Sequence, residues 1–442
     1  QTFALPIYQL SAFIFTALLA SFGVLFFGIH KAKASAVEGR ALAAMPTFSL
    51  DAVFFGNYLD SINFYVADHF PFRESFVSFS FKLKRWRGYP DDEVSFYAGG
   101  IDVDQGIDAF AEGDSTGQPH VGKDTLLMQN AGNIDDVGQL SRGLLIYDGM
   151  AIQMFGGGRR TAISAAQAMN EVVAKLPANV QMYVGVTPTH GEFYLPAGYN
   201  KNYNSERKNI DTLYAYLNPR IKSFDICYEL HRHKNEYIFF NTDHHWTGTG
   251  AYYAHVALCK AAGFEPIPMA QMETKAIPNF LGSLYRQTRD RRLQENPDSV
   301  VYHKIPNRYQ AYRLSGDGYG NKNPTQLYVE AAKGGNAYGV FLGGDVPAMC
   351  IESDRTNGRT ALIIKNSYGN ALAPFLPAYF ERTFVIDYRY FQSNLLDFIE
   401  KNKVTDFIVF HNSFSANTPS HIAMMTAMCT TKPRNVRPIA KT

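Results

Sequence analysis

Two short blocks of this 442-residue chain contain the residue types that nucleophilic acyl transfer requires. The first is Asn241-Thr242-Asp243-His244-His245-Trp246-Thr247-Gly248, and the second is Lys365-Asn366-Ser367-Tyr368-Gly369-Asn370. A serine hydroxyl attacks poorly at neutral pH and must give its proton to a base, for which an imidazole that titrates at about 6.5 is suited. We therefore predict that Ser367 is a nucleophile, that His245 is its base, and that Asp243 orients the imidazole and stabilises its charged form.

The turn after Ser367 offers donors that could stabilise an oxyanion. The candidates are the backbone N–H groups of Tyr368 and Gly369 and the side-chain amide of Asn370. With these donors, the second block would supply both the nucleophile and the group that stabilises the negative charge formed by its attack.

An Asp-His-His run could instead bind a metal, since carboxylate and imidazole are good ligands and the DHH phosphoesterases carry this triplet. Those enzymes also need aspartate clusters upstream. The tight acidic groups before residue 243 are Asp91-Asp92-Glu93 and Asp135-Asp136, and neither forms a DxD pattern at a strand end. We predict a site without metal or other cofactor and keep the metal-dependent phosphoesterase as an alternative.

Strands and helices alternate in the region that contains both blocks. Apolar strand candidates cover residues 144–147, 180–187, 237–240, 339–342, 361–364, 383–386 and 407–410, and helical segments cover 161–175, 206–217, 249–262 and 372–377. This alternation predicts an α/β fold with a mainly parallel sheet covered on both faces. Because catalytic loops lie at the carboxyl ends of such strands, both blocks should open on one rim of the sheet.

The first thirty residues form a separate, strongly apolar unit, and about twenty apolar residues suffice to cross a bilayer. We predict an uncleaved membrane anchor over residues 1–33. A signal peptide is the alternative, because Ala32-Lys33-Ala34-Ser35-Ala36 resembles a cleavage site. Basic residues follow the apolar stretch, so the positive-inside rule alone would place the bulk of the chain in the cytoplasm.

Four parts are predicted along the chain. After the anchor, residues 34–140 form an approach segment and insertion, with helices at 58–70 and 76–86. Residues 141–425 form the catalytic domain, in which residues 269–335 break the alternating pattern and are interpreted as an insertion or lid. Residues 426–442 form a tail.

Charge and cysteine content limit the partners and the kind of metal site. The 42 basic and 40 acidic residues give a net charge of +2, which provides no broad attractive field for nucleic acid. The cysteines show no CxxC spacing, which argues against structural zinc. Either disulfide bridges or four buried thiols are compatible with their number. They are Cys227, Cys259, Cys350 and Cys429.

The chain resembles the DHHW-motif proteins and the related alginate O-acetylation proteins, which belong to the SGNH-hydrolase-like group. The matching blocks occur in family order from residue 38 to about residue 412. They are Glu38-Gly39-Arg40-Ala41-Leu42-Ala43-Ala44-Met45-Pro46, Asp68-His69-Phe70-Pro71-Phe72-Arg73, Thr187-Pro188-Thr189 with Tyr194-Leu195-Pro196, Asp243-His244-His245-Trp246, Phe341-Leu342-Gly343-Gly344, Lys365-Asn366-Ser367-Tyr368-Gly369-Asn370 and Asp387-Tyr388-Arg389-Tyr390-Phe391.

This resemblance implies a three-layer α/β/α sandwich in which the Asp-His block precedes the serine block. It implies a membrane-anchored, extracytoplasmic O-acetyltransferase or acetylesterase, in the periplasm or at the cell surface, that acts on a cell-surface or exported polysaccharide. A membrane-bound acyltransferase could supply its acetyl groups. The alternative from another class is a polysaccharide-binding or export adaptor without catalytic activity.

The family's residue roles transfer to individual positions of this chain. Ser367 matches the nucleophile, His245 the base and Asp243 the orienting acid. Arg389 falls where the family has a basic residue near the site, and it could stabilise an oxyanion or a sugar hydroxyl, or only form a salt bridge with Asp387. Trp246 could stack on a sugar or pack behind His245. The family often has an acidic residue where this chain has Asn366, so the charge next to the serine differs from the family pattern.

Overall fold

The computed structural model describes residues 4–28, 57–73 and 141–429, apart from 316, 317, 319, 320 and 392, together with short stretches between residues 31 and 97. The chain forms two compact units. The first comprises Gln1–Asp91 and Ile107–Glu112, and the second comprises Asp92–Gly106 and Gly113–Thr442.

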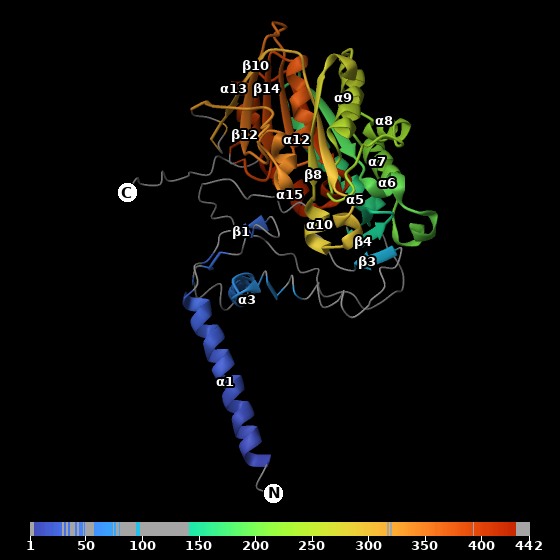
Figure 1. Ribbon diagram of the computed structural model, residues 1–442. Helices are drawn as coiled ribbons and strands as arrows, with labels where there is room; N and C mark the ends of the chain where they lie inside the picture. Colours follow the sequence, from blue (N-terminus) through green and yellow to red (C-terminus); the bar gives the residue numbers. More distant parts are fainter. Residues whose placement is uncertain are drawn as a thin grey trace. The chain divides into compact units, whose positions relative to one another are not determined.

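The first unit contains the apolar helix α1 (Ala4–Gly28), labelled in Figure 1. Its segment Gln9–Gly28 is long and apolar enough to cross a membrane, a property that signal sequences share. The short strands β1 (Ala34–Ser35) and β2 (Arg40–Ala41) pair in antiparallel fashion, and α3 (Asn57–Asp68) confirms the predicted helix at 58–70. The helix predicted at 76–86 lies almost entirely outside the described residues.

The second unit is built on an eight-stranded sheet with the order β11-β10-β12-β14-β13-β15-β6-β7. The five strands from β14 to β7 are parallel, and the three at the other edge are antiparallel, so the sheet is mainly parallel as predicted. The strands are β6 (Gln181–Thr187), β7 (Ile221–Ser223), β10 (Tyr309–Arg313), β11 (Asn323–Thr325), β12 (Ala348–Ser353), β13 (Thr360–Lys365), β14 (Arg382–Asp387) and β15 (Asp406–Asn412).

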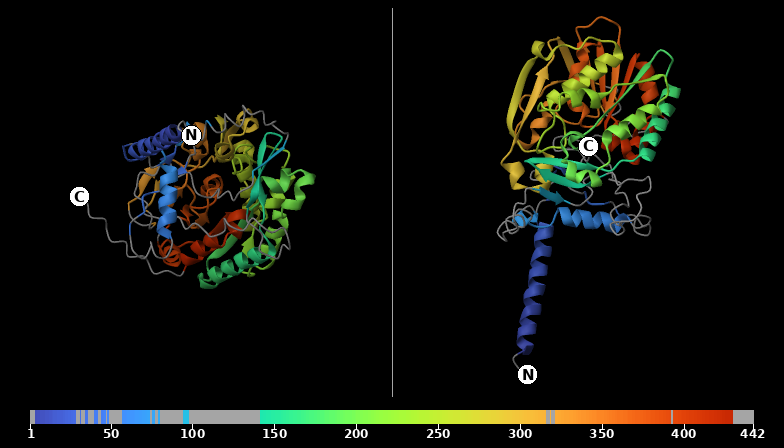
Figure 2. Two further views of the ribbon diagram at one scale, coloured as in Figure 1. Left: turned by 90° about the horizontal axis from the view of Figure 1, so that it is seen from below. Right: turned by 90° about the vertical axis from the view of Figure 1, so that its right-hand side faces the viewer.

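Helices cover both faces of this sheet, which gives three layers (Figures 1 and 2). One layer contains α8 (Ile226–Arg232), α9 (Gly248–Ala262), α12 (Gly369–Leu372) and the 3-10 helix η5 (Ala373–Ala378). The other contains α5 (Arg159–Lys175), α7 (Glu206–Ala215), α13 (Leu395–Lys401) and α15 (Pro419–Ala427).

The apolar run of β13 follows from this double burial. Ala361 and Ile363 pack in the core on the α9 side, whereas Leu362 and Ile364 pack in the core on the α5 side. Successive side chains of a strand point to opposite faces, so a strand covered on both faces must be apolar throughout.

Smaller elements surround the sheet. The strands β3 (Val94–Tyr97), β4 (Ser141–Tyr147) and β5 (Met150–Phe155) form an antiparallel sheet, and β8 (Glu273–Phe280) pairs with β9 (Asp298–Lys304). The other helices among residues 141–429 are short: α6 (His190–Tyr194), η2 (Ala197–Asn202), η3 (Met269–Gln271), α10 (Ser283–Thr288), α11 (Arg291–Gln294), η4 (Gly334–Val340) and α14 (Ser413–Asn417). Residues 269–335, interpreted above as an insertion or lid, thus include the paired strands β8 and β9 and the last two strands at one end of the main sheet, β10 and β11.

Two predicted strands are wrong. Residues 237–240 form only an isolated bridge between Phe239 and Trp246, and residues 339–342 form the end of η4 and a bridge between Tyr328 and Phe341. Both runs are apolar because they are buried in the core on the α9 side and not because they pair in a sheet. The helix predicted at 372–377 is irregular, since its prolines lack the N–H group that an α-helix needs.

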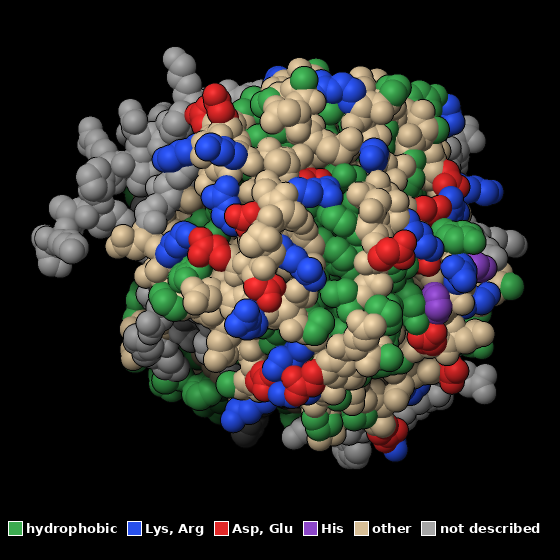
Figure 3. Space-filling model, turned by 90° about the horizontal axis from the view of Figure 1, so that it is seen from above, with side chains coloured by type: hydrophobic (Ala, Val, Ile, Leu, Met, Phe, Trp, Pro, Cys, Tyr) green, Lys and Arg blue, Asp and Glu red, His purple; other side chains and the backbone are tan. Residues whose placement is uncertain are grey.

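The structure shows how the charged residues are distributed on one face and which state the cysteines adopt. On the face shown in Figure 3, Lys and Arg side chains are interspersed with Asp and Glu. All four cysteines are buried free thiols, so of the two interpretations left open above, the structure has the thiols.

The start of α9 packs too closely against β9 for a larger residue than Gly248, because an added Cβ would lie 2.3 Å from the backbone oxygen of Val301. We expect Gly248→Ala to lower the free energy of unfolding by about 1 to 3 kcal/mol, the usual cost of overpacking. Chemical denaturation measures this change. Gly198→Ala is the matched control, since nothing lies within 4 Å of its added Cβ. An equal effect of both substitutions would contradict the prediction.

Candidate active site

The Asp-His block lies in a tight loop that closes just before α9. The N–H of Thr247 donates to the carbonyl of Ile238 at 3.0 Å, and the N–H of Phe240 donates to the carbonyl of His245 at 3.3 Å. The hydroxyl of Thr247 then caps α9 by accepting from the N–H of Gly250. Residues 241–245 are therefore fixed at both ends.

Asp298 of β9 also holds this loop in place through hydrogen bonds. Its buried carboxylate accepts from the backbone N–H groups of Asn241 and Thr242, both at 2.7 Å, and from the hydroxyl of Thr242 at 2.6 Å. Strand β9 thus helps to build the loop that contains Asp243.

The serine block forms a turn between β13 and α12. The N–H of Gly369 donates to the carbonyl of Asn366 at 3.0 Å, and the N–H of Asn370 donates to the carbonyl of Ser367 at 3.1 Å. A side chain at Gly369 would collide with Cβ of Lys365 at 2.4 Å, so the turn needs glycine there. Ser367 consequently lies just beyond the carboxyl end of β13.

The structure brings the predicted serine, histidine and aspartate together. Nε2 of His245 lies 2.8 Å from Oγ of Ser367, and Nδ1 of His245 lies 2.6 Å from Oδ1 of Asp243. With the proton on Nδ1, the imidazole donates to Asp243 and accepts from Ser367, which is the arrangement of a base that can take the serine proton. All three residues are buried, and Ser367 keeps 7% of its surface exposed.

Asp243 is held in its charged form. Burial alone would raise the pKa of this carboxyl, but the charges of His245 and His244 and the hydrogen bonds from His245 and from the N–H of Ser283 hold the pKa well below its usual range. The N–H of Ser283 donates to Oδ2 at 2.7 Å, and the N–H of His245 donates to Oδ1 at 3.0 Å. A charged Asp243 favours the protonated imidazole that forms when His245 takes a proton.

Tyr338 packs against one face of the His245 imidazole. The two rings stack with centroids 4.0 Å apart, and the hydroxyl of Tyr338 donates to the carbonyl of Ser367 at 3.1 Å. Nδ1 of the second histidine, His244, lies 2.6 Å from the hydroxyl of Ser283. His244 therefore bonds to Ser283, whereas His245 bonds to Ser367.

Trp246 is fully buried and therefore offers no face for a sugar. Its ring stacks on Phe410, and its Nε1–H donates to the carbonyl of Tyr368 at 3.0 Å. Of the two roles considered for Trp246, the structure has the packing behind the site, because the ring belongs to the core.

The predicted oxyanion donors have internal acceptors here. The N–H groups of Tyr368 and Gly369 donate to the side-chain and backbone oxygens of Asn366, and the amide of Asn370 donates to Asp345 at 2.8 Å. Their function toward an oxyanion stays a prediction. Asn366 also donates to Asn412 and Ser415, so its amide both gives and accepts hydrogen bonds, which a carboxylate at this position could not do.

Arg389 belongs to a buried charge cluster beneath the serine turn. It donates to Asp387 and to Asp345, each at 2.7 Å, and Lys365 donates to Asp387 at 2.9 Å. Burial opposes the charge of Arg389, but the two carboxylates raise the pKa of its guanidinium well above the ordinary value. Of the two interpretations of Arg389, the structure contains the salt bridge with Asp387. The cluster connects Lys365, two residues before the serine, with Asn370, three residues after it.

The donor atoms of Asp243, His244 and His245 lie within 4.8 Å of one another, which is close enough to consider a metal. Both ring nitrogens of His245 already bond to Asp243 and Ser367. A metal on His245 would therefore have to displace one of the two hydrogen bonds that join the three residues.

Sequence reasoning missed four contributors to this site: Ser283, Asp298, Tyr338 and Asp345. Ser283 acts toward Asp243 through a backbone N–H, which any residue but proline provides, so its identity gave no signal. Tyr338 and Asp345 flank the block Phe341-Leu342-Gly343-Gly344, and the position of that block in the family order was the available signal.

One family model and several solved structures are similar to this chain. The family model described as "DHHW protein" matches residues 161–386. The crystal structure of a DHHW family protein from Eubacterium siraeum is 32% identical, with a TM-score of 0.61 over 66% of this chain and 97% of that chain. The chain belongs to the DHHW family. No match was found among curated proteins.

Two further solved structures resemble this DHHW protein. Bacillus cereus PatB1, solved with a sulfonyl adduct, is 17% identical, with a TM-score of 0.52 over 63% of this chain and 98% of that chain. The O-acetyltransferase domain of Pseudomonas putida AlgJ is 15% identical, with a TM-score of 0.36 over 66% of this chain and 99% of that chain. At such identity, the likeness to PatB1 shows the fold alone, which is the SGNH-hydrolase-like α/β fold. In this chain, the Asp-His block precedes the serine block.

Ser283 offers a test of the hydrogen bond to Asp243. Ser283→Pro removes the N–H donor but suits the first position of α10, and the preceding Gly282 has the extended backbone that proline requires. If Asp243 works as proposed below, we expect kcat/KM for an activated acetyl ester to fall about 10- to 100-fold, since hydrogen bonds to charged groups contribute about 1.5 to 3 kcal/mol. Ser283→Ala keeps the N–H and is the control. Equal activities of the two variants would contradict a role for this bond.

Proposed function

We propose that this DHHW protein transfers acetyl groups to a hydroxyl of a cell-surface or exported polysaccharide, or removes them, through an acyl-enzyme formed on Ser367. The observation that carries the proposal is the continuous hydrogen-bond chain from Asp243 through His245 to Ser367. The resemblance of the motif blocks to those of alginate O-acetylation proteins motivates the acetyl group and the glycan.

The reaction has two halves. Oγ of Ser367 forms a bond to the acyl carbon while its proton passes to Nε2 of His245, and the donor's leaving group departs with that proton. A sugar hydroxyl then attacks the acyl-enzyme, gives its proton to His245, and leaves as the acetyl ester while Ser367 regains a proton. With water as acceptor, the same steps produce acetate and free enzyme.

The apolar helix α1 motivates the proposed location. We assign it the role of an uncleaved membrane anchor that holds the catalytic domain, residues 141–425, outside the cytoplasm. A membrane-bound acyltransferase would then supply acetyl groups at the same membrane. This location follows the family resemblance and not the distribution of basic residues around the helix.

The proposal predicts a covalent intermediate. Full-length protein incubated with an activated acetyl ester should gain one acetyl group on Ser367, detected by peptide mass spectrometry, and a sulfonyl fluoride should block the reaction. PatB1 has been solved with a sulfonyl adduct, which motivates that reagent. Ser367→Ala and His245→Ala should each lower turnover at least about a thousandfold, since both act in the proton transfer.

Two outcomes would point to the alternatives. Absence of adduct and turnover, combined with glycan binding that survives Ser367→Ala, would favour a polysaccharide-binding adaptor. Turnover of a phosphoester that a chelator abolishes would favour a metal site on Asp243, His244 and His245.

A further inference from the structure

Arg286 is a partly buried arginine of α10 that takes no part in the proton transfers proposed above. Its Nη1 donates to the carbonyl of Gly335 at 2.9 Å and to the carbonyl of Leu281 at 3.3 Å. An added Cβ at Gly335 would lie 3.3 Å from Nη1, so glycine leaves room for the guanidinium. Because Gly335 belongs to η4, this side chain connects two elements whose bonded residues are 49 positions apart in the chain.

Both elements support the base, His245, through different contacts. Helix α10 acts through Asp243, because the N–H of Ser283 donates to Oδ2 of Asp243 at 2.7 Å and Nδ1 of His245 lies 2.6 Å from Oδ1. Helix η4 acts through Tyr338, whose ring stacks on the imidazole with centroids 4.0 Å apart. Tyr338 follows Gly335 by one turn of the 3-10 helix. A shift of η4 at Gly335 would therefore move the ring that lies on the base.

The partners of the Arg286 guanidinium are carbonyl oxygens and not carboxylates. It forms no ion pair with an acidic residue in the part of the chain that the structure describes, and its Nε is buried without a hydrogen-bond partner. Burial lowers the pKa of this guanidinium below its ordinary value, whereas the charge of Asp243 raises it. Because a cation without a carboxylate partner is costly to bury, packing alone does not account for an arginine at this position.

We propose that Arg286 is a positioning residue of this site: it joins α10 to η4 and thereby keeps the Tyr338 ring on the imidazole of His245 while that imidazole exchanges a proton with Ser367. This inference rests on the proposed function, because it gives the contact a role in turnover. Arg286 acts through Gly335 and Tyr338 and is not itself a catalytic residue. A guanidinium suits this role, since one of its nitrogens can donate to two carbonyl groups and its charge strengthens both hydrogen bonds.

Kinetics with an activated acetyl ester test this proposal on full-length protein in detergent. Arg286→Met keeps the length and the apolar part of the side chain but removes every hydrogen-bond donor. We expect kcat to fall about 10- to 100-fold while KM changes less than about threefold, since the substrate still binds but the base is misplaced. Arg286→Lys keeps the charge and three donors, and it should restore kcat to within about fivefold of wild type.

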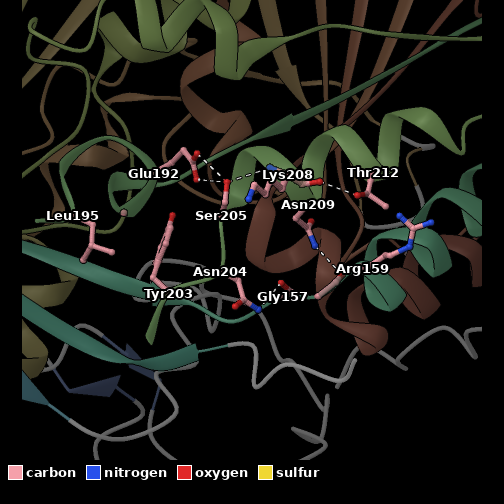
Figure 4. Close-up of a pocket in the computed structure, with 12 residues that line it drawn as sticks. Gly157, Arg159, Glu192, Leu195, Tyr203, Asn204, Ser205, Lys208, Asn209 and Thr212 are labelled. Carbon is pink, nitrogen blue, oxygen red and sulfur yellow. Dashed lines mark hydrogen bonds between the residues drawn. The ribbon is translucent and has the colours of Figure 1, made fainter. Parts of the chain in front are cut away.

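Two other arginines serve as matched controls. Arg289 follows the same helix, and its guanidinium lies over the ring of Tyr285. Arg159, labelled in Figure 4, belongs to α5 and donates to the hydroxyl of Tyr216 at 2.8 Å. Substitution of either by methionine should lower kcat less than about twofold. An equal loss of kcat in Arg286→Met and Arg289→Met, or an Arg286→Lys protein as slow as Arg286→Met, overturns the inference.

Hydrogen exchange separates failure of this inference from failure of the proposed function. The backbone N–H groups of residues 334–342 should exchange about tenfold or more faster in Arg286→Met than in Arg159→Met, because η4 loses a charge-assisted hydrogen bond. Residues 406–412 of β15 should exchange at the same rate in both proteins. Wild-type protein without acetyl-ester turnover would refute the proposed function, and the exchange rates would still decide whether Arg286 holds η4. Unchanged exchange of residues 334–342 contradicts the inference in either case.

Discussion

The hydrogen bond between His245 and Ser367 joins two segments that are 122 residues apart, and the site exists only while the fold holds them together. Two other hydrogen bonds join the same segments: Nε1–H of Trp246 donates to the carbonyl of Tyr368, and the hydroxyl of Tyr368 donates to the carbonyl of His244. Both bonds are buried. The residues next to the base and the nucleophile therefore fix their relative position, and the two side chains need not do so themselves.

Buried charge is the second constraint on this region. Asp243 is fully buried beside two histidines, and Lys365 is fully buried beside Asp387 and Asp345. Removing one member of such a group would leave a charge in a medium that cannot solvate it, at a cost of about 3 to 5 kcal/mol. The serine turn is attached to this charge cluster through Lys365 on one side and Asn370 on the other. The cluster is stable only when all of its charged members are present.

The sequence predicted those parts of the site that a local pattern specifies. The continuous apolar run at residues 361–364 predicts a strand, and the structure shows the reason for that run, since both faces of the strand are buried. Asp243, His245 and Ser367 are predictable because their chemistry restricts the residue types. Residues 237–240 misled the prediction, since an apolar run reports burial and does not distinguish a paired strand from a buried loop. Ser283 could not be predicted, because it acts through a backbone N–H that any residue but proline provides. For Tyr338, one tyrosine among 27, the only signal was its position close to the family block at residues 341–344.

The four cysteines have a consequence for where this fold can form. Each thiol is buried and unbridged, and burial raises its pKa, to about 12 for Cys227 and Cys259 and about 11 for Cys350 and Cys429. Protonated, enclosed thiols react slowly with oxidants. The fold of the domain therefore contains no disulfide bridge among its four cysteines that an oxidant would have to form.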